Sequence, residues 1–294
     1  TLNPVSIIKK GDSYILDMGQ NMVGWLQIHI KGQHAGDTLR MRFAEMLNPD
    51  TTLYTANLRT VEQTDIYVAK DRKPFTWKPS FTYHGFRYVE IKGLRKRPYA
   101  RNLEGHVLYD DMKTTGSFGC SDEMMNKIYS NAYWGIRGNY NGMPTDCPQR
   151  DERLGWSGDR TTGAYGEGYI FDNRQLYSKW IKDFADSQNE SGALSDVVPN
   201  YWRLYSDNLT WTGAFITTAD MVLQQFGDDR PVKEHYDVMK KWMVYMKNRY
   251  GKDGIITKDR YGDWCMPPES LEIIHSKDPS RKTAAGVLST AYYH

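Results

Sequence analysis

The densest run of ionisable side chains lies in residues 143–159, MPTDCPQRDERLGWSGD. Pro148 disfavours helix at Cys147, and Gly155 and Gly158 interrupt helix afterwards. We therefore expect a loop, and loops on a rigid scaffold are where catalytic side chains concentrate. The charged and aromatic residues in this run are Asp146, Arg150, Asp151, Glu152, Arg153, Trp156 and Asp159.

Charges at this spacing allow two interpretations. Arg150 and Arg153 could simply neutralise the carboxylates on a solvated surface. Alternatively, three carboxylates in one loop that turn inward would raise the pKa of one of them. A carboxylic acid that stays protonated near neutral pH can protonate the leaving oxygen of a glycoside. Trp156 and the two glycines favour the second interpretation, because a solvated charged face needs neither.

The elements before this run are predicted to be strands. Short segments that alternate or cluster β-branched and aromatic residues are punctuated by Gly and Asp, which is typical of an antiparallel β-sandwich. We predict a β-sandwich domain over residues 1–110 and a linker over residues 111–118. A basic stretch, KGLRKRPYARN, precedes the last predicted strand, GHVLYDD. The other predicted strands are SYILDMG, WLQIHIKG, TLRMRFAEML, TDIYVAK and FRYVEIKG.

The hydrophobic period changes after the linker, and residues 119–294 are predicted to be all-α. Ser121 or Asp122 is the expected N-cap of the first helix. Gly227 is an expected C-cap, and Pro231 is expected in the first turn of a helix. Leu176, Trp180, Ile181 and Phe184 are expected to form one buried stripe. The predicted helical segments are CSDEMMNKIYSNAYWGIRGNY, NRQLYSKWIKDFADSQ, TGAFITTADMVLQQFGD, PVKEHYDVMKKWMVYMKNRYG and the start of KTAAGVLSTAYYH.

Composition excludes several classes of partner. The net charge of +2 comes from 38 basic and 36 acidic residues, which gives no case for nucleic acid or an anionic membrane. No run of about 18 apolar residues is present. Cys120, Cys147 and Cys265 lie far apart, which argues against a disulfide scaffold or a zinc site. We expect no metal and no cofactor. Aromatic residues make up 13% of the chain, and some are candidate platforms for sugar rings.

The motif DCPQRDERLGWSGD resembles the signature of the bacterial α-L-rhamnosidases, which remove terminal rhamnose with inversion. The segments DMGQNMVGW, AEMLNPDTTLYTANLRTVEQTD and FTYHGFRYVEIKG resemble the β-sandwich that precedes the catalytic domain of that family. GALSDVVPNYW, LTWTGAF and YGDW resemble later landmarks of its (α/α)6 barrel. The resemblance covers nearly the whole chain.

The resemblance also implies a role for individual residues. Glu152 matches the general acid, and Ser157 stands where the family commonly has Thr. The residues that the resemblance implies in substrate binding are Asp146, Arg150, Trp156, Asp159, Trp211, Asp263 and Trp264.

An inverting glycosidase also needs a general base, a second carboxylate about 6.5–9.5 Å from the acid. The resemblance places this base beyond His294. We therefore expect about the first half of the barrel here, with the remaining C-terminal part of the same polypeptide as its partner, and we expect the isolated chain to be inactive or nearly so. The candidates within the chain for a substitute base are Asp196, Asp263, Glu269 and Glu272, of which the last two also fit a solvated helix start.

The resulting prediction is an α-L-rhamnosidase that acts on glycosides or polysaccharides containing terminal rhamnose. Two alternatives stay open: a carbohydrate-binding protein without catalysis, which would use the sandwich, and an (α/α)6 hydrolase of another sugar, because a fold does not fix a function. The sequence leaves open the aglycone, the linkage and the oligomeric state. It also leaves open the compartment, which could be bacterial cytoplasm, periplasm or extracellular.

Overall fold

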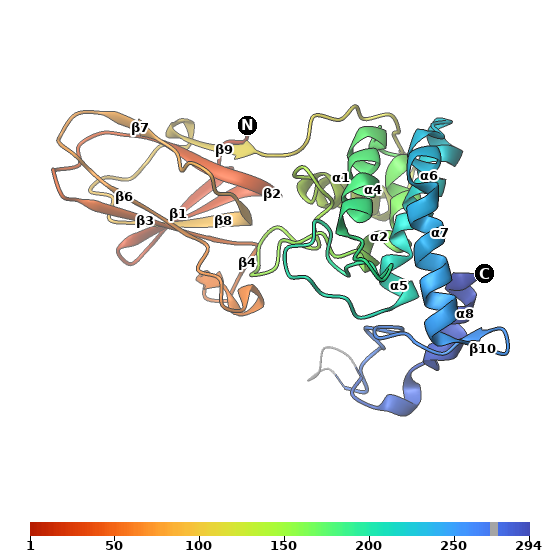
Figure 1. Ribbon diagram of the computed structural model, residues 1–294. Helices are drawn as coiled ribbons and strands as arrows, with labels where there is room; N and C mark the ends of the chain where they lie inside the picture. Colours follow the sequence, from red (N-terminus) through yellow and green to blue (C-terminus); the bar gives the residue numbers. More distant parts are fainter. Residues whose placement is uncertain (271–275) are drawn as a thin grey trace. The chain divides into compact units, whose positions relative to one another are not determined.

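A computed structural model describes residues 1–270 and 276–294, and consists of an antiparallel sheet domain followed by a helical domain (Figure 1). It divides into two compact units. The sheet unit comprises Thr1–Asp111, Phe118–Asn141 and Thr145–Arg153, and the helical unit comprises Met112–Ser117, Gly142–Pro144 and Leu154–His294. The predicted order of the two domains is confirmed, whereas the predicted boundaries at residues 110 and 119 stay a prediction.

The strands of the sheet unit pair only antiparallel among the described residues. Its elements are β1 (Ser6–Lys10), β2 (Ser13–Ile30), β3 (Thr38–Ala44), β4 (Met46–Leu47), β5 (Leu53–Tyr54), η1 (Ala56–Leu58), β6 (Thr64–Val68), β7 (Phe75–Trp77), β8 (His84–Lys92), η2 (Ala100–Asn102) and β9 (Leu103–Val107).

Strand β2 takes part in both layers of the sandwich. Its first part pairs with β1 and β8, in the order β1-β2-β8-β3-β6, and its last part pairs with β7 and β9. The register with β8 shifts between Asp17 and Met22, where the strand bends. Gly24 lies just after the bend at φ +151°, and a β-carbon there would collide with the backbone carbonyl of His106. Only glycine therefore permits β9 to approach β2 this closely.

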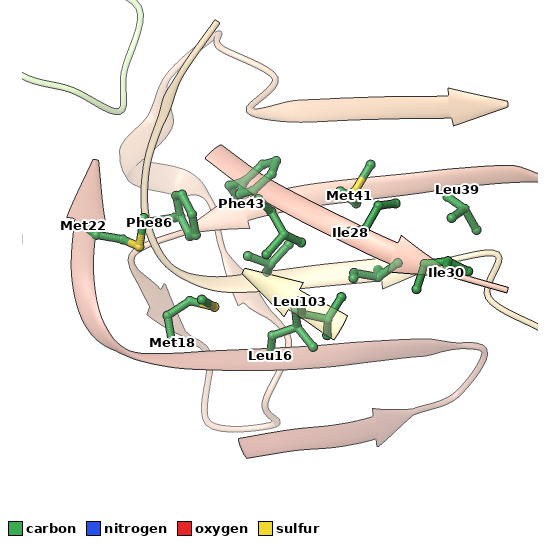
Figure 2. Packing of buried hydrophobic residues seen from close by; sticks show 13 residues of the cluster. Leu16, Met18, Met22, Ile28, Ile30, Leu39, Met41, Phe43, Phe86 and Leu103 are labelled. Carbon is green, nitrogen blue, oxygen red and sulfur yellow. The ribbon is translucent and has the colours of Figure 1, made fainter. Parts of the chain in front are cut away.

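The core of the sheet unit lies between the two layers (Figure 2). Alternate residues of β2 point into it, because side chains on a strand alternate between its two faces. Leu26 and Ile28 are fully buried there. Their partners from the other strands include Leu39, Met41, Phe43, Phe86, Val89, Ile91 and Leu103.

Helix α1 (Glu123–Gly138) belongs to the sheet unit. Its N-cap is Asp122, whose carboxylate accepts hydrogen bonds from the backbone of Met124 and Met125, as the sequence predicted. Trp134 packs against the sheet core. A β-carbon on Gly138 would lie 2.6 Å from a methyl carbon of Val23, so this glycine allows the helix to lie close to β2.

The buried stripe that the sequence predicts lies on helix α4 of the helical unit. Trp180, Ile181 and Phe184 of α4 are fully buried, and Phe184 stacks on Phe215 of α6 at 5.3 Å between ring centroids. Gly227 ends α6 in the left-handed conformation, as expected. The elements are α2 (Gly158–Thr161), α3 (Ala164–Gly168), α4 (Arg174–Ser187), α5 (Leu209–Thr212), α6 (Ala214–Phe226), α7 (Arg230–Tyr250), β10 (Gly251–Lys252), β11 (Ile255–Ile256), η3 (Pro279–Arg281) and α8 (Ala285–Tyr293).

None of the helices in the described part of the chain has the length and apolar character needed to cross a membrane.

The sandwich core makes a testable contribution to stability. We expect Ile28→Ala to destabilise the protein by about 2–5 kcal/mol, because it leaves a cavity at a fully buried position. Ile66→Ala is the matched control, since the Ile66 side chain is 58% exposed on β6 and its loss should cost less than about 0.5 kcal/mol. Thermal and urea unfolding measure both; equal losses would contradict the proposed core.

Candidate active site

A cluster of opposite charges surrounds Glu152 in the sheet unit. Glu152 Oε2 lies 2.8 Å from Nη2 of Arg150, and its Oε1 lies 3.3 Å from Nη1 of Arg59. The same Arg150 nitrogen lies 3.4 Å from Oδ2 of Asp146, whose side chain is only 3% exposed. The structure thus brings together the predicted acid and two of the predicted sugar-binding residues.

The surroundings of Glu152 favour its protonated form. Burial raises the pKa of Glu152, and a hydrogen bond with Asp146 and the negative charge of that residue raise the pKa further. The positive charges of Arg150 and Arg59 oppose this rise. A carboxyl group in this balance keeps its proton to a higher pH than an ordinary glutamic acid and still has cations beside it once the proton has left.

Two residues that the sequence analysis gave no role hold this part of the loop. Arg59 follows η1 at φ +59° and pairs with Glu152. The backbone N–H and the hydroxyl of Thr60 donate to Oδ2 of Asp151, which lowers the pKa of Asp151. Asp151 is therefore an anchor of the loop. Arg59 and Thr60 lie about 90 residues before the acid, and no local pattern connects segments that far apart.

The first half of the charged motif, up to Arg153, lies against the start of β8. Gln63 exchanges two hydrogen bonds with the backbone of Gly85, at 3.1 and 3.2 Å. A β-carbon on Gly85 would lie 2.9 Å from the β-carbon of Gln149, so the loop can approach only because residue 85 is glycine. Arg153 donates to the Tyr83 carbonyl at 2.8 Å, and its guanidinium lies 5.1 Å from the centre of the Tyr83 ring. Arg153 thus holds the loop to the segment that precedes β8.

The charge cluster borders a cavity of about 430 Å³ within the sheet unit. Asp146, Cys147 and Arg150 line it together with residues from the bend of β2 and from α1. Glu45 lines it as well, and its carboxylate accepts a hydrogen bond from Asn21 at 2.9 Å. The sequence analysis gave no role to these sandwich residues, because strand periodicity does not show which residues border a loop from elsewhere in the chain.

Asp146, Cys147 and Glu152 also offer three potential metal-ligand atoms within 4.8 Å of one another. These groups already have other partners. Arg150 pairs with the carboxylates of Asp146 and Glu152, and burial and a hydrogen bond with Asp146 raise the pKa of Cys147 to about 11, so a metal ion would have to displace both the guanidinium and the thiol proton. The other two cysteines, Cys120 and Cys265, are free and exposed.

The second half of the motif contributes to an aromatic cluster in the helical unit. Tyr261 is its central residue, with ring centroids 6.2 Å from Trp156, 4.5 Å from Trp211 and 5.3 Å from Trp264. Trp202 lies edge-on to Trp156 at 5.9 Å. The three predicted tryptophans therefore come together. Tyr261 and Trp202 were not predicted, and the only signal for Tyr261 is its place in the YGDW segment.

Asp196 fixes the central tyrosine of this cluster. Its carboxylate is fully buried and accepts hydrogen bonds from the Tyr261 hydroxyl at 2.9 Å and from the Asn208 amide at 2.8 Å. Burial raises the pKa of Asp196, against the effect of these hydrogen bonds. Burial and the neighbouring Asp196 raise the pKa of Tyr261 to about 12. The Ser157 hydroxyl donates to the Asp196 carbonyl at 2.9 Å, so the motif is tied to the same site.

The remaining predicted carboxylates have other surroundings. Asp159 is exposed in the first turn of α2. Asp263, beside Trp264, accepts a hydrogen bond from the Thr283 backbone at 2.6 Å, and hydrogen bonds from the side chain and the backbone of Thr283 lower the pKa of Asp263. Glu269 pairs with Arg281 at 2.9 Å, and hydrogen bonds with Ser276 and Arg281 lower its pKa. Glu272 lies outside the described residues.

A sheet domain followed by a helical domain, with paired carboxyl groups and clustered tryptophans, fits a glycoside hydrolase. Residues 8–109 match the family described as the bacterial alpha-L-rhamnosidase concanavalin-like domain, and residues 113–294 match its 6 hairpin glycosidase domain. The chain belongs to the bacterial α-L-rhamnosidase family.

Individual relatives agree with this membership. The alpha-L-rhamnosidase of Streptomyces avermitilis is 37% identical over 281 residues, which cover 95% of this chain and 26% of that protein. The structure of the alpha-L-rhamnosidase from Dictyoglumus thermophilum superposes with a TM-score of 0.92 at 38% identity, over 99% of this chain and 32% of that one. A Streptomyces avermitilis alpha-L-rhamnosidase crystallised with L-rhamnose gives a TM-score of 0.90 at 36% identity, over 99% of this chain and 27% of that one. The chain thus spans about a third or less of the length of these relatives.

The aromatic cluster depends on a glycine of the motif. A β-carbon on Gly158 would overlap the indole ring of Trp211, so Gly158→Ala should displace that ring and change the tryptophan fluorescence and near-UV circular dichroism. Gly166→Ala is the matched control, because a β-carbon there meets nothing within 4 Å. Unchanged spectra for Gly158→Ala, or the same change in both variants, would contradict the described packing.

Proposed function

We propose that this chain is part of an α-L-rhamnosidase that hydrolyses terminal α-L-rhamnose from a glycoside or polysaccharide with inversion. The observation that carries the proposal is the Glu152 carboxyl, which is partly buried, hydrogen-bonded to Asp146 and flanked by two arginines. Rhamnose as the released sugar is supported by family membership and by the relative that was crystallised with L-rhamnose.

Glu152 is proposed as the general acid. In its protonated form it donates to the glycosidic oxygen as the bond to rhamnose breaks, which neutralises the charge that develops on the leaving group. The Asp146 charge keeps the proton on Glu152 until that moment. Arg150 and Arg59 then stabilise the carboxylate that remains, so three neighbouring side chains together support the two protonation states of Glu152.

The sugar-binding roles are assigned by type of side chain. Asp146 and Asp159 are proposed to accept hydrogen bonds from rhamnose hydroxyls, and Arg150 is proposed to donate to the sugar. Asp263 is proposed as a further acceptor, since a carboxylate can accept more hydrogen bonds than Thr283 donates to it. Flat indole rings suit the C–H faces of a sugar, and Tyr261 holds the three that are assigned this role: Trp156, Trp211 and Trp264.

The general base is proposed to lie in the polypeptide beyond this chain, within the second half of an (α/α)6 barrel. Within the described residues, Asp196 is occupied by Tyr261 and Asn208, and Glu269 by Ser276 and Arg281. A base must accept a proton from water. The Asp196 carboxylate is fully buried, and the hydrogen bonds with Ser276 and Arg281 that lower the pKa of Glu269 make it a weaker base. Turnover by residues 1–294 alone would contradict this assignment.

Replacement of the acid tests the proposal. In the whole protein, we expect Glu152→Gln to lower kcat/KM for phenyl α-L-rhamnoside by about 10²–10⁴-fold, because proton donation is lost. The loss should be smaller for a nitrophenyl leaving group, which departs with less protonation. Steady-state assays with both substrates measure the difference.

Glu62→Gln is the matched control for this substitution, since Glu62 is exposed in the same unit and no described residue pairs with it. It should leave both rates within about twofold of the wild type. Equal losses with the two leaving groups would show that Glu152 is not the proton donor, and absence of rhamnose release by the wild type would remove the proposed function.

The pH profile of activity tests how the charges around Glu152 set its pKa. Glu152 acts while protonated, so kcat/KM falls as the pH rises through its pKa. Asp146→Asn removes a charge that raises this pKa, and the alkaline limb should move to lower pH. Arg59→Ala removes a charge that lowers it, and the limb should move to higher pH. Profiles of kcat/KM from pH 4 to 9 separate the two shifts; movement in the same direction would contradict the electrostatic argument.

A further inference from the structure

A second cavity of the sheet unit, of about 670 Å³, lies outside the residues that surround Glu152. It is lined by the end of β2, by β7 and by the segment from Lys96 to Asn102. That segment is the basic stretch KGLRKRPYARN, which the proposed rhamnosidase mechanism does not use. We call this cavity the basic cleft.

The strand geometry explains which side chains line it. Ile28 and Ile30 of β2 point into the sandwich core (Figure 2), so His29 lies on the opposite face and Lys31 follows at the strand end. His29 is opposite Thr76 of β7, and its ring hydrogen-bonds to the Thr76 hydroxyl at 2.8 Å. The cleft therefore has a rigid strand floor.

The cleft carries one sign of charge. Lys31, Lys96, Arg97 and Arg101 line it, and none of them forms a salt bridge with another residue that the structure describes. Among the described lining residues there is no Asp or Glu. Two acidic groups lie beside the lining. Asp37, which accepts from Gln33, binds Arg95 through two hydrogen bonds, whereas Glu104 lies 3.4 Å from Nε2 of His29, so four cations face one carboxylate that no described Lys or Arg pairs with. These 294 residues together carry a net charge of only +2, so this concentration of cations is local.

The uncharged lining fits a carbohydrate. Tyr99 is 64% exposed, and the Arg101 guanidinium lies 5.1 Å from the centre of its ring. Asn102 adds an amide group, which binds hydroxyls as donor and acceptor. Pro74 and Pro98 of the lining restrict the backbone. Cations, an aromatic ring and an amide together match a chain of sugars that bears negative groups.

We propose that the basic cleft binds an anionic polysaccharide, through uronate carboxylates or sulfate esters, and so holds an acidic polymer to the sheet domain. The choice of a carbohydrate as the ligand rests on the proposed rhamnosidase function; the preference for negative charge rests on the cleft alone. An exposed cation next to an anion contributes modestly, and several unpaired cations in one concave site act together.

Titration calorimetry of the whole protein at low salt tests the proposal, with polygalacturonate, a sulfated galactan and a neutral galactan as probes. We expect binding of at least one acidic polymer and none of the neutral one. Lys96→Glu and Arg101→Glu should each weaken binding by about tenfold, because reversal replaces an attraction with a repulsion of similar size. Added salt should weaken wild-type binding as well. The two acidic probes distinguish carboxylate from sulfate.

Arg40→Glu is the matched control, since Arg40 is exposed on β3, does not line the cleft, and its reversal changes the net charge by the same amount. It should bind like the wild type. Equal weakening by Arg40→Glu, no weakening by the cleft variants, or equal binding of the neutral galactan would overturn the proposal. Tighter binding of a DNA duplex than of either acidic polymer would overturn it in favour of a nucleic-acid site.

Release of rhamnose from an aryl α-L-rhamnoside separates this proposal from the proposed function. The cleft variants should hydrolyse that small substrate within about twofold of the wild-type rate. A wild type that hydrolyses it and binds no acidic polymer would overturn the cleft proposal alone. A wild type that binds the polymer and releases no rhamnose would overturn the rhamnosidase function alone.

Discussion

Two carboxyl groups, those of Asp146 and Glu152, share a hydrogen bond in a site where the Asp146 side chain is almost completely shielded from water. Two like charges at this range are costly, and the pKa of Glu152 is raised as a result. Arg150 contacts both carboxyl groups and opposes this rise. The chemistry proposed for this family member depends on this arrangement, because a general acid must keep its proton to a higher pH than an ordinary glutamic acid does.

The sheet unit supplies the rigidity that such a pair requires. Arg59 and Thr60 hold the carboxylates of residues 151 and 152 from the segment after η1, and Gly85 lets the loop lie against β8. A catalytic group must be held within a fraction of an ångström of its productive position. Contacts from other segments of the sheet unit achieve this better than contacts within the loop, whose prolines and glycines interrupt regular hydrogen bonding. The sandwich is therefore more than an appended domain: it positions the proposed acid.

Local patterns predicted much of the architecture. Alternation found the strands, the stripe of α4 followed from its period, and Asp122, Gly227 and Pro231 marked helix ends correctly. Contacts between distant segments escaped prediction. β2 can pair with β9 because Gly24 allows the two strands to approach closely. Helix α1 packs on the sheet through Trp134. A hydrogen bond to Asp196 holds Tyr261 among the tryptophans. Each of these depends on a tertiary contact, for which a periodic signal carries no information. The resemblance to the rhamnosidase family implied roles for the residues of the motif, but none for Arg59, which pairs with Glu152.

The two halves of the charged motif use burial in opposite ways. Up to Arg153, which takes a left-handed conformation, like charges lie close together and the pKa of Glu152 is raised. After Arg153, in the helical unit, Ser157 ties the motif to the buried residue Asp196, whose carboxylate accepts hydrogen bonds from a phenol and an amide. A buried carboxyl with neutral hydrogen-bond partners fixes the positions of those partners, since any displacement leaves a buried polar group without a hydrogen bond. It therefore suits the task of fixing Tyr261 and the rings around it, whereas the charged pair suits proton transfer, which requires a state that can change.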